Sequence, residues 1–364
     1  MKTKFTILMG VLLMFASFSG CKKSTPVEQV KMLGWVIGGS DGKYGTIFHT
    51  DDGGATWIRQ GDSIQLPNTG FSDVCIMDAN TIIVVGESPA GNQAVVIKSI
   101  DGGKTWLPAG ISFLKNVGYN CVFSIGKEHL WIVGDSGAAY YSNDVAVSWT
   151  KLQLPVENQT NILLRVAARN QDDIWIGTNA SSPDSFPLVL HTTDGGNSWA
   201  HLNPLKDLDL SESKGGHILG VKLFGNSIWV LGGFGKFVIR SADNGATWSD
   251  VTQSGGTADA NDLYLISESK AYLVTDYNGI FYTSDAGLHW TDYSYSTGNW
   301  YLGVAWLPPG NVWVVGSPGA GQAHSEIIHS PNGGNKWDDQ TPEFFITNHI
   351  PPYKIRFIAV VNSY

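Results

Sequence analysis

The chain has 364 residues, including 43 glycines and 14 tryptophans, and a formal net charge of −9 at pH 7. Its charged residues are scattered, so it carries no basic stripe for nucleic acid, and nucleic-acid binding is set aside. No long stretch has helical periodicity. Many short strands separated by glycine-rich turns instead indicate a β-sandwich, barrel or propeller.

Residues 1–20 have the pattern of an export signal. Lys2 and Lys4 precede an apolar stretch that is short for a membrane span, and a small-small-Cys ending follows at Cys21. This ending resembles a bacterial lipobox, which implies that Cys21 becomes the lipidated N-terminus. The alternative is an ordinary signal peptide with a chance cysteine. No other apolar run reaches spanning length, so attachment to the membrane would be by lipid alone.

The remainder of the chain divides into a tether and one domain. Residues 21–30 form the tether, and residues 31–364 form the domain, which we expect to be a monomer. Lys22 and Lys23 lack the acidic run that resembles surface-export signals, so we expect the periplasmic face of the outer membrane, with the cell surface as the alternative. Cys75 and Cys121 are predicted to be buried thiols rather than a disulfide.

A nine-residue motif recurs seven times. Its first copy, "HTDDGGATW", covers residues 49–57, and successive copies end in tryptophans 42 to 50 residues apart. Each copy has a hydroxyl residue, a carboxylate two residues on, a glycine two beyond that and a tryptophan. The third copy has Ala146 at the glycine position, and the seventh has Asn332 at the aspartate position. A period of this length is typical of stacked or radial repeats.

The composition of the motif predicts a tight turn. An Asp side chain that accepts hydrogen bonds from backbone N–H groups one or two residues on closes an Asx-type turn. Glycine supplies positive φ, and the tryptophan folds back over the turn. We interpret the motif side chains as structural rather than catalytic or calcium-binding, because a calcium loop needs several acidic ligands close together. The positions are Asp52, Asp101, Asp144, Asp194, Asp243, Asp285 and Asn332.

Two further strands precede each motif. An apolar strand such as "DVCIM" is strand A, a following strand such as "WVIGG" is strand B, and the motif joins strands C and D. Four antiparallel strands in about 45 to 50 residues make one propeller blade. The first repeat begins at strand B, whereas the tail "YKIRFIAVVNSY" matches an unaccompanied strand A. We therefore predict an all-β, seven-bladed propeller closed by C-terminal pairing with the strand near Trp35, which removes exposed edges.

The recurring pattern resembles the Asp-box (BNR) propellers, and most closely the photosystem II stability and assembly factor-like family. In such families the boxes lie on the hairpins away from the binding face. The resemblance implies a non-enzymatic propeller that holds a partner polypeptide or helps to assemble a complex. A glycan is the alternative partner. No cofactor is implied, and no Cys/His cluster has the spacing of metal ligands.

An enzymatic function remains the second hypothesis. Sialidases and xyloglucanases resemble this chain in carrying Asp boxes. Sialidases use three arginines to hold the substrate carboxylate, but only Arg165 and Arg356 are suitably placed among the five arginines here. Xyloglucanases cleave in the groove between two propellers, and this chain supplies one. We assign no catalytic residue and retain a glycosidase as the alternative.

The candidate ligand-binding residues belong to the face with the B–C loops and the D-to-A crossovers, opposite the Asp turns. Loops that vary over a constant scaffold are where binding is usually built. Aligned strands A place Asp73, Arg165, Asp262 and Arg356 near the mouth of the central channel, together with Cys121, Gly220 and Gly303. The charged residues form either a ring of mutual ion pairs or a polar anchor beside aromatic side chains that could stack on a sugar or grip a peptide. The aromatic residues are Tyr293, Tyr295, Trp300 and Tyr301.

Overall fold

The computed structural model describes residues 31–40, 44–61, 69–88, 93–111, 117–254, 258–295, 298–319, 325–343 and 355–363. The predicted signal, Cys21 and the tether lie outside these residues. One compact unit covers Lys31–Tyr364. In the described part of the chain, no helix is long and apolar enough to cross a membrane.

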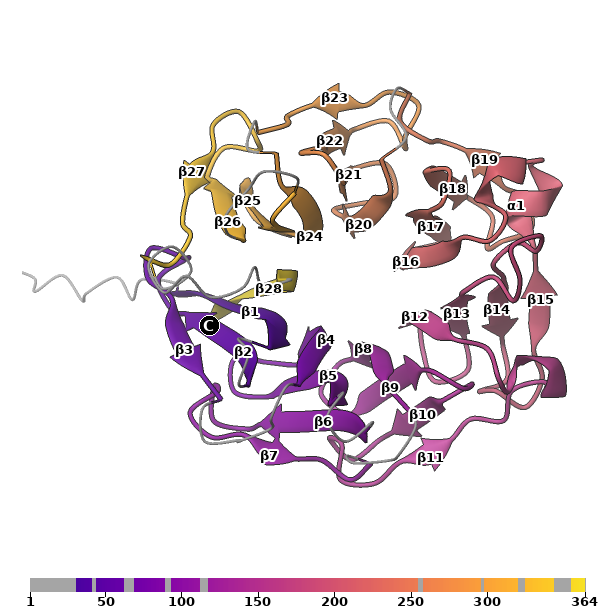
Figure 1. Cartoon of the computed structure of the whole chain (residues 1–364), viewed down its shortest axis with the longest axis horizontal. Helices are drawn as coiled ribbons and strands as arrows, with labels where there is room; N and C mark the ends of the chain where they lie inside the picture. Colours follow the sequence, from indigo (N-terminus) through magenta and orange to yellow (C-terminus); the bar gives the residue numbers. More distant parts are fainter. Residues whose placement is uncertain are drawn as a thin grey trace, which may run out of the picture. The chain divides into compact units, whose positions relative to one another are not determined.

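Seven four-stranded antiparallel sheets are arranged in a ring within this unit, which confirms the predicted propeller (Figure 1). Blade 1 consists of β28 (Ile355–Ser363), β1 (Lys31–Ser40), β2 (Gly45–Thr50) and β3 (Ile58–Gln60); blade 2 of β4 (Gly70–Ile76), β5 (Ile82–Ser88), β6 (Gln93–Ser99) and β7 (Leu107–Pro108); and blade 3 of β8 (Tyr119–Ile125), β9 (His129–Gly134), β10 (Ala139–Ser142) and β11 (Thr150–Lys151).

The other four blades repeat the same order. Blade 4 consists of β12 (Leu163–Ala168), β13 (Ile174–Thr178), β14 (Val189–Thr192) and β15 (Ala200–Leu202); blade 5 of β16 (His217–Phe224), β17 (Ser227–Gly233), β18 (Phe237–Ser241) and β19 (Ser249–Asp250); blade 6 of β20 (Ala260–Leu265), β21 (Ala271–Thr275), β22 (Ile280–Thr283) and β23 (Thr291–Asp292); and blade 7 of β24 (Trp300–Leu307), β25 (Asn311–Ser317), β26 (Glu326–Ser330) and β27 (Asp338–Asp339). The first strand of each blade lies nearest the centre (Figure 1).

Short helices occur in the crossovers around blade 4. The 3-10 helix η1 (Val156–Asn158) precedes it, and α1 (Pro204–Asp207) and the 3-10 helix η2 (Ser211–Ser213) follow it. The Asn203 side chain accepts a hydrogen bond from the Lys206 N–H and caps α1. Leu205 anchors α1 because its side chain is buried in the core shared with blade 5.

The ring closes through the C-terminal strand, as predicted. β28 pairs antiparallel with β1, from Lys31 opposite Ser363 to Gly38 opposite Ile355. Strand β28 is therefore the innermost strand of a blade whose other three strands come from the start of the domain. Closure of this kind removes the exposed edge that the first and last blades would otherwise carry.

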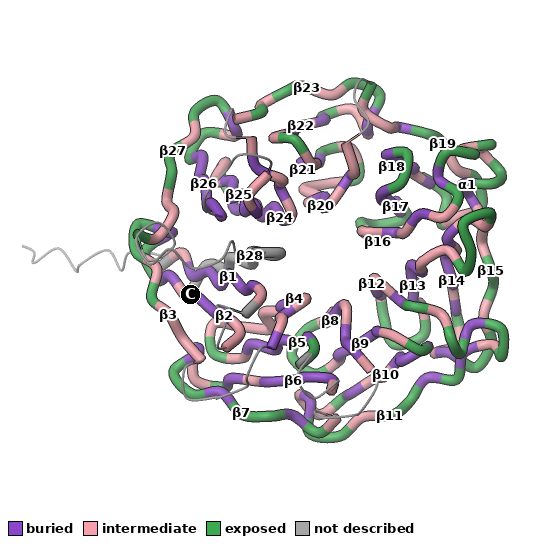
Figure 2. Tube along the Cα trace, in the orientation of Figure 1, coloured by how far each residue is buried: buried purple, intermediate pink, exposed green. Residues whose placement is uncertain are grey.

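Tryptophan fills the middle of most blades. At one position of the second strand, five blades carry a fully buried indole, at Trp35, Trp131, Trp175, Trp229 and Trp313. The cross-strand partner is an imidazole in three of them; the Trp175 and His191 ring centroids, for example, are 3.7 Å apart and stacked. Burial of one such ring contributes a few kcal/mol, about 25 cal/mol per Å² of apolar area. Figure 2 shows the buried residues along these strands and the exposed ones at the outer turns.

The Asp box is held together by a local hydrogen-bond network. The Thr50 hydroxyl donates to Asp52 Oδ1 over 2.8 Å and accepts from the Gly54 N–H over 2.8 Å. Asp52 in turn accepts from the backbone N–H and the hydroxyl of Thr56, over 2.9 and 2.7 Å. The sequence predicted that the carboxylate accepts from N–H groups one or two residues on, and this prediction is wrong. The carboxylate accepts from a residue four positions on, because the turn is wider than an Asx turn.

The same network recurs in the two boxes that depart from the motif. The Ala146 N–H donates to the Ser142 hydroxyl with φ at 58°, so alanine adopts the left-handed backbone that glycine has elsewhere. Asn332 Oδ1 accepts from the Ser330 hydroxyl and the Lys336 N–H. In a regular box, hydrogen bonds from the side chain and the N–H of Thr105 hold the pKa of Asp101 at about 2. The box carboxylates are thus ionised at neutral pH.

We expect deletion of residues 353–364 to abolish cooperative unfolding or to cause aggregation. The deletion removes β28 and leaves the hydrogen-bonding edge of β1 open, and open strand edges associate with other chains. Thermal unfolding followed by circular dichroism, together with size-exclusion chromatography, measures the effect. Deletion of residues 21–30 is the control. A truncated protein that melts cooperatively at the parental temperature would show that closure does not depend on this strand.

Candidate functional site: the central channel and its loop-rich mouth

The inner strands of blades 2 to 7 enclose a cavity of about 540 Å³ in the centre of the ring. Asp73, Arg165 and Asp262 line this cavity, together with Cys121. Cavities of this size hold small ligands or a few side chains of a partner. The structure therefore brings three of the four predicted charged residues into one channel.

The fourth predicted charged residue, Arg356, does not occupy the aligned position of the other three. Each inner strand carries a β-bulge just before the aligned position, for example between Phe71 and Asp73 in β4. In β28 the bulge falls at Arg356, so that Phe357 is the residue equivalent to Asp73. The predicted alignment of Arg356 is thus wrong by one residue. All seven inner strands share this bulge, so the bulge is not the cause of the error; the unbroken apolar run from Phe357 to Val361 allows the strand to be aligned in either register.

The charged residues of the channel connect neighbouring blades. Asp73 accepts from the Val122 N–H of the next blade over 3.0 Å. Asp262 accepts from the Val304 N–H over 3.2 Å and pairs with Lys222 Nζ over 2.7 Å. The Arg165 Nε–H donates to the Leu219 carbonyl of the following blade over 2.6 Å. Lys222, which the sequence analysis missed, follows the aligned Gly220 by two residues.

Burial and pairing together set the ionisation of these groups. Burial raises the pKa of Asp73, and the positive charge of Arg165 opposes this change. Burial acts to lower the pKa of Lys222, but the adjacent Asp262 carboxylate outweighs it, so the pKa is raised. Lys222 therefore remains cationic and paired at neutral pH.

The two cysteines of the channel are free thiols, as predicted. Burial raises the pKa of Cys75 to about 12, and its thiol lies 2.9 Å from the Ser124 hydroxyl. Burial also raises the pKa of Cys121. A nucleophilic cysteine requires a thiolate, so both residues act as small packing side chains, Cys121 buried as predicted and Cys75 half-buried. Within the described ranges, no three His, Cys, Asp or Glu side chains gather as a metal-binding group.

The structure divides the predicted aromatic cluster. Tyr301 is fully buried and its hydroxyl donates to the Tyr295 carbonyl over 3.3 Å. Tyr293 packs 6.4 Å from the Tyr282 ring, in the core between blades 6 and 7. Only Trp300 lies beside an exposed aromatic residue, Tyr277, at a centroid distance of 6.5 Å.

Two neighbouring B–C turns each present an exposed aromatic side chain that the sequence analysis missed. Phe234 follows β17 and is 61% exposed, and Tyr277 follows β21 and is 67% exposed. Both have left-handed backbones, with φ of 60° and 56°. Non-glycine residues adopt this conformation at an energetic cost, and such residues cluster at functional sites. The available signal was an aromatic residue beside glycine or asparagine in a short turn.

Carboxylates lie at the ends of several blades on this face. Asp135 and Asp276 occupy equivalent positions and accept hydrogen bonds from Asn120 and Asn261, over 3.0 and 2.8 Å. Burial raises the pKa of Asp276, and repulsion from the nearby Asp259 adds to the increase. The mouth therefore carries four acidic side chains. Glu87, Asp135 and Asp276 lie at the ends of second strands, and Asp259 lies just before an inner strand. Their charge favours a basic ligand there.

A family model described as the photosynthesis system II assembly factor YCF48 matches residues 111–208 and 149–297, which together span just over half of the chain. The chain belongs to this family. The photosystem II assembly lipoprotein Ycf48 of Synechococcus sp. (strain CC9902) is 22% identical over 270 residues, covering 70% of this Ycf48-family chain and 73% of the relative.

Solved structures agree with the fold assignment. A structure of YCF48 bound to D1 peptide has a TM-score of 0.56 at 19% identity, covering 74% of this chain and 81% of its own. YCF48 from Cyanidioschyzon merolae has a TM-score of 0.55 at 16% identity, covering 74% and 84%. The GH74 enzyme of Niastella koreensis has a TM-score of 0.53 at 12% identity, covering 80% and 62%. At these identities the similarity establishes the propeller fold.

We expect Asp73→Ala to lower the free energy of unfolding by about 2–3 kcal/mol, because it leaves the Val122 N–H unpaired and Arg165 without a neighbouring negative charge. Urea unfolding measures this difference. Asp184→Ala, at an exposed residue, should stay within about 0.5 kcal/mol of the parent. Unchanged stability of Asp73→Ala would mean that Asp73 does not connect the blades and is available to a ligand.

Proposed function

We propose that this Ycf48-family protein is an exported, membrane-anchored, non-enzymatic propeller that binds a polypeptide partner on its loop-rich face and assists the assembly of a complex. The observation that carries the proposal is the pair of exposed aromatic side chains on neighbouring turns, Phe234 and Tyr277. Family membership agrees with it, because a relative was solved with a bound peptide.

The energetics of the exposed pair favour a docking surface. Complete burial of an aromatic ring stabilises a complex by about 1.5–3 kcal/mol, and buried aromatic residues dominate most interfaces. The Phe234 N–H donates to Asp259 Oδ1 over 3.1 Å, and this bond fixes the turn before any partner arrives. A surface that is ordered in advance loses less entropy on binding.

The charge around the pair selects the chemistry of the partner. Asp259 and Asp276 flank the aromatic turns, and Glu87 and Asp135 continue the acidic rim. Complementary charge accelerates association and disfavours acidic competitors. The preferred partner is therefore a polypeptide segment with basic and apolar side chains.

Site-specific photo-crosslinking in the native host tests this function. A photoreactive phenylalanine analogue at Phe234 or Tyr277 should give one discrete polypeptide adduct, identified by mass spectrometry. The same analogue at Leu288, which is 75% exposed in an Asp box on the opposite face, should not give it. With the identified partner, Phe234→Ala and Tyr277→Ala should each weaken binding roughly tenfold. Equal adducts at all three positions, or a glycan in place of a polypeptide, would contradict the proposal.

Membrane attachment is proposed to rest on lipidation of Cys21, which lies outside the described residues. The Synechococcus relative is described as a lipoprotein, and the residues around Cys21 agree with such an anchor here. The proposed location is the periplasmic face of the outer membrane, with the cell surface as the alternative.

We expect Cys21→Ala to move the protein from the membrane fraction to the soluble fraction. A lipidated N-terminal cysteine carries more than one acyl chain, and two lipid signals are needed for firm anchoring. Cell fractionation with metabolic labelling by a fatty-acid analogue measures the change. Cys121→Ala should retain the label and the membrane location. A membrane-bound Cys21→Ala protein would exclude the lipid anchor.

A further inference from the structure

Three blades place the tryptophan of the second strand against the Asp box of the next blade. The Trp175 ring lies 2.7 Å from where a Cβ on Gly245 would stand, and the Trp229 ring lies 3.3 Å from the corresponding point on Gly287. The Trp313 Nε1–H donates to the Gly53 carbonyl over 3.2 Å. The indole thus fills the space between two blades on the Asp-box side of the ring.

Two blades lack this tryptophan, with different consequences. Blade 2 has Ile83, and Ala146 of the neighbouring box packs in the same core with Trp149 beside it. Blade 6 has Tyr272 at this position. Tyr272 pairs with Tyr264 of the first strand, just as Trp131 pairs with Phe123 in blade 3, so the two residues are equivalent. At this junction the smaller phenol leaves a pocket of about 410 Å³ between blades 6 and 7.

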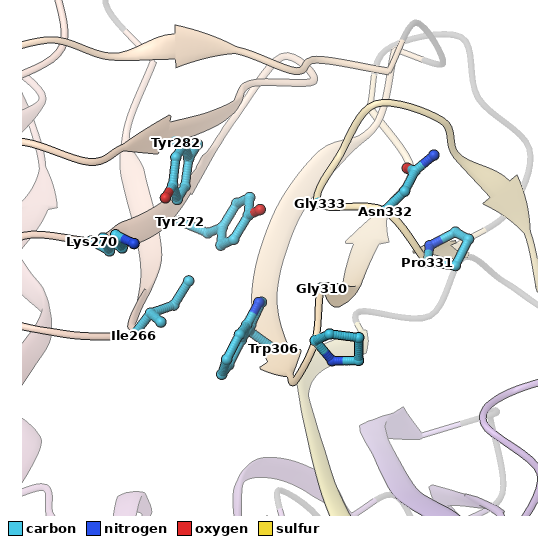
Figure 3. Close-up of a pocket in the computed structure, with 10 residues that line it drawn as sticks. Ile266, Lys270, Tyr272, Tyr282, Trp306, Gly310, Pro331, Asn332 and Gly333 are labelled. Carbon is cyan, nitrogen blue, oxygen red and sulfur yellow. The ribbon is translucent and has the colours of Figure 1, made fainter.

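Aromatic and donor groups line the pocket. Figure 3 shows side chains of blade 6 on one side, the turns of blade 7 on the other and Trp306 between them. The lining includes Lys270, Tyr272, Tyr282, Trp306 and Gly333. The amide of the seventh box, Asn332, points away from the aromatic rings (Figure 3), and its Oδ1 already accepts two hydrogen bonds.

The Tyr272 hydroxyl has no hydrogen-bond partner among the described residues. Tyr272 is only 3% exposed, and its oxygen lies 3.3 Å from where a Cβ on Gly333 would stand, at the wall of the pocket. Burial raises the pKa of Tyr272 and of Tyr282, so that both phenols remain donors. The hydroxyl oxygen is accessible from the pocket, so it can donate to an acceptor on a bound ligand.

The charge of the pocket is positive. Lys270 lies at its rim, and no carboxylate side chain is among the described residues that line it. Lys270 also forms no ion pair with any residue that the structure describes. The pocket therefore combines flat apolar rings with one cation and two phenolic donors, a combination suited to an anion attached to a ring.

We propose that this pocket binds a sugar residue that carries a carboxylate. A pyranose ring has an apolar face that stacks on Trp306, and its carboxylate accepts from Lys270 and the Tyr272 hydroxyl. A neutral sugar would form no charge-assisted hydrogen bond with the lysine, and an apolar ligand would displace water from the phenols without replacing its hydrogen bonds. A volume of about 410 Å³ lies in the range of small-molecule sites. This site lies on the Asp-box side, away from the proposed polypeptide-binding face.

Titration of the full mature protein with glucuronate, glucose and benzoate tests the proposal. Isothermal calorimetry and saturation-transfer NMR should detect saturable binding of glucuronate, with glucose and benzoate each roughly tenfold weaker. Lys270→Gln should remove the preference for glucuronate over glucose. Tyr272→Phe, which deletes one hydroxyl and keeps the ring, should weaken glucuronate binding several-fold.

The decisive variant is Tyr272→Trp. It restores the residue found at this position in five other blades, so it should fill the pocket, abolish glucuronate binding and keep the parental melting temperature. Tyr141→Phe is a control outside the pocket: Tyr141 is equivalent to Tyr282 but lies opposite Trp131 in blade 3, so this change should leave glucuronate binding unaltered. Absence of glucuronate binding, equal binding of glucose or benzoate, or retained binding in Tyr272→Trp would each overturn the proposal. Crosslinking at Phe234 should persist in Tyr272→Trp.

Discussion

The contact between one blade and the Asp box of the next is the constraint on which the rest of this propeller depends. A single four-stranded sheet buries too little apolar surface to be stable, and each blade here is completed by its neighbours. The tryptophan of one blade lies under the box of the following blade, and Trp313 extends the same contact across the closure to Gly53. The ring is therefore stable only when all seven blades are present and the last meets the first.

The inner strands add a second, polar set of connections. Asp73, Arg165 and Asp262 each bond to the backbone of the next blade, and Asn120 and Asn261 do the same from the bulge position. These groups lie in the channel, so they could be taken for a ligand site. Their hydrogen bonds give them a role in holding the blades together, and they leave the variable turns on the loop-rich face free to recognise a partner.

Sequence reasoning succeeded where the determining contacts are local. The Asp box is a network within nine residues, so its seven copies can be counted and their spacing predicts the blades. It was less successful along the inner strands, where the continuous apolar run of β28 left its alignment ambiguous, so that Arg356 was placed one residue off, and where Lys222 was overlooked. The exposed aromatic residues were missed because exposure depends on what the neighbouring loops cover, and a sequence does not show that.

The sequence by itself thus determined the repeat, the number of blades and the closing strand, because each depends on patterns short enough to read along the chain. Tertiary structure alone decided which departures from the repeat matter. Ile83 and Tyr272 both replace the tryptophan of the second strand. At Ile83 the neighbouring box supplies Ala146 to a filled core, whereas Tyr272 faces Gly333, which occupies the position of Val145 in the third box, and a pocket remains. Packing depends on both sides of a contact, and the two sides are separated by about 60 residues of chain in each case.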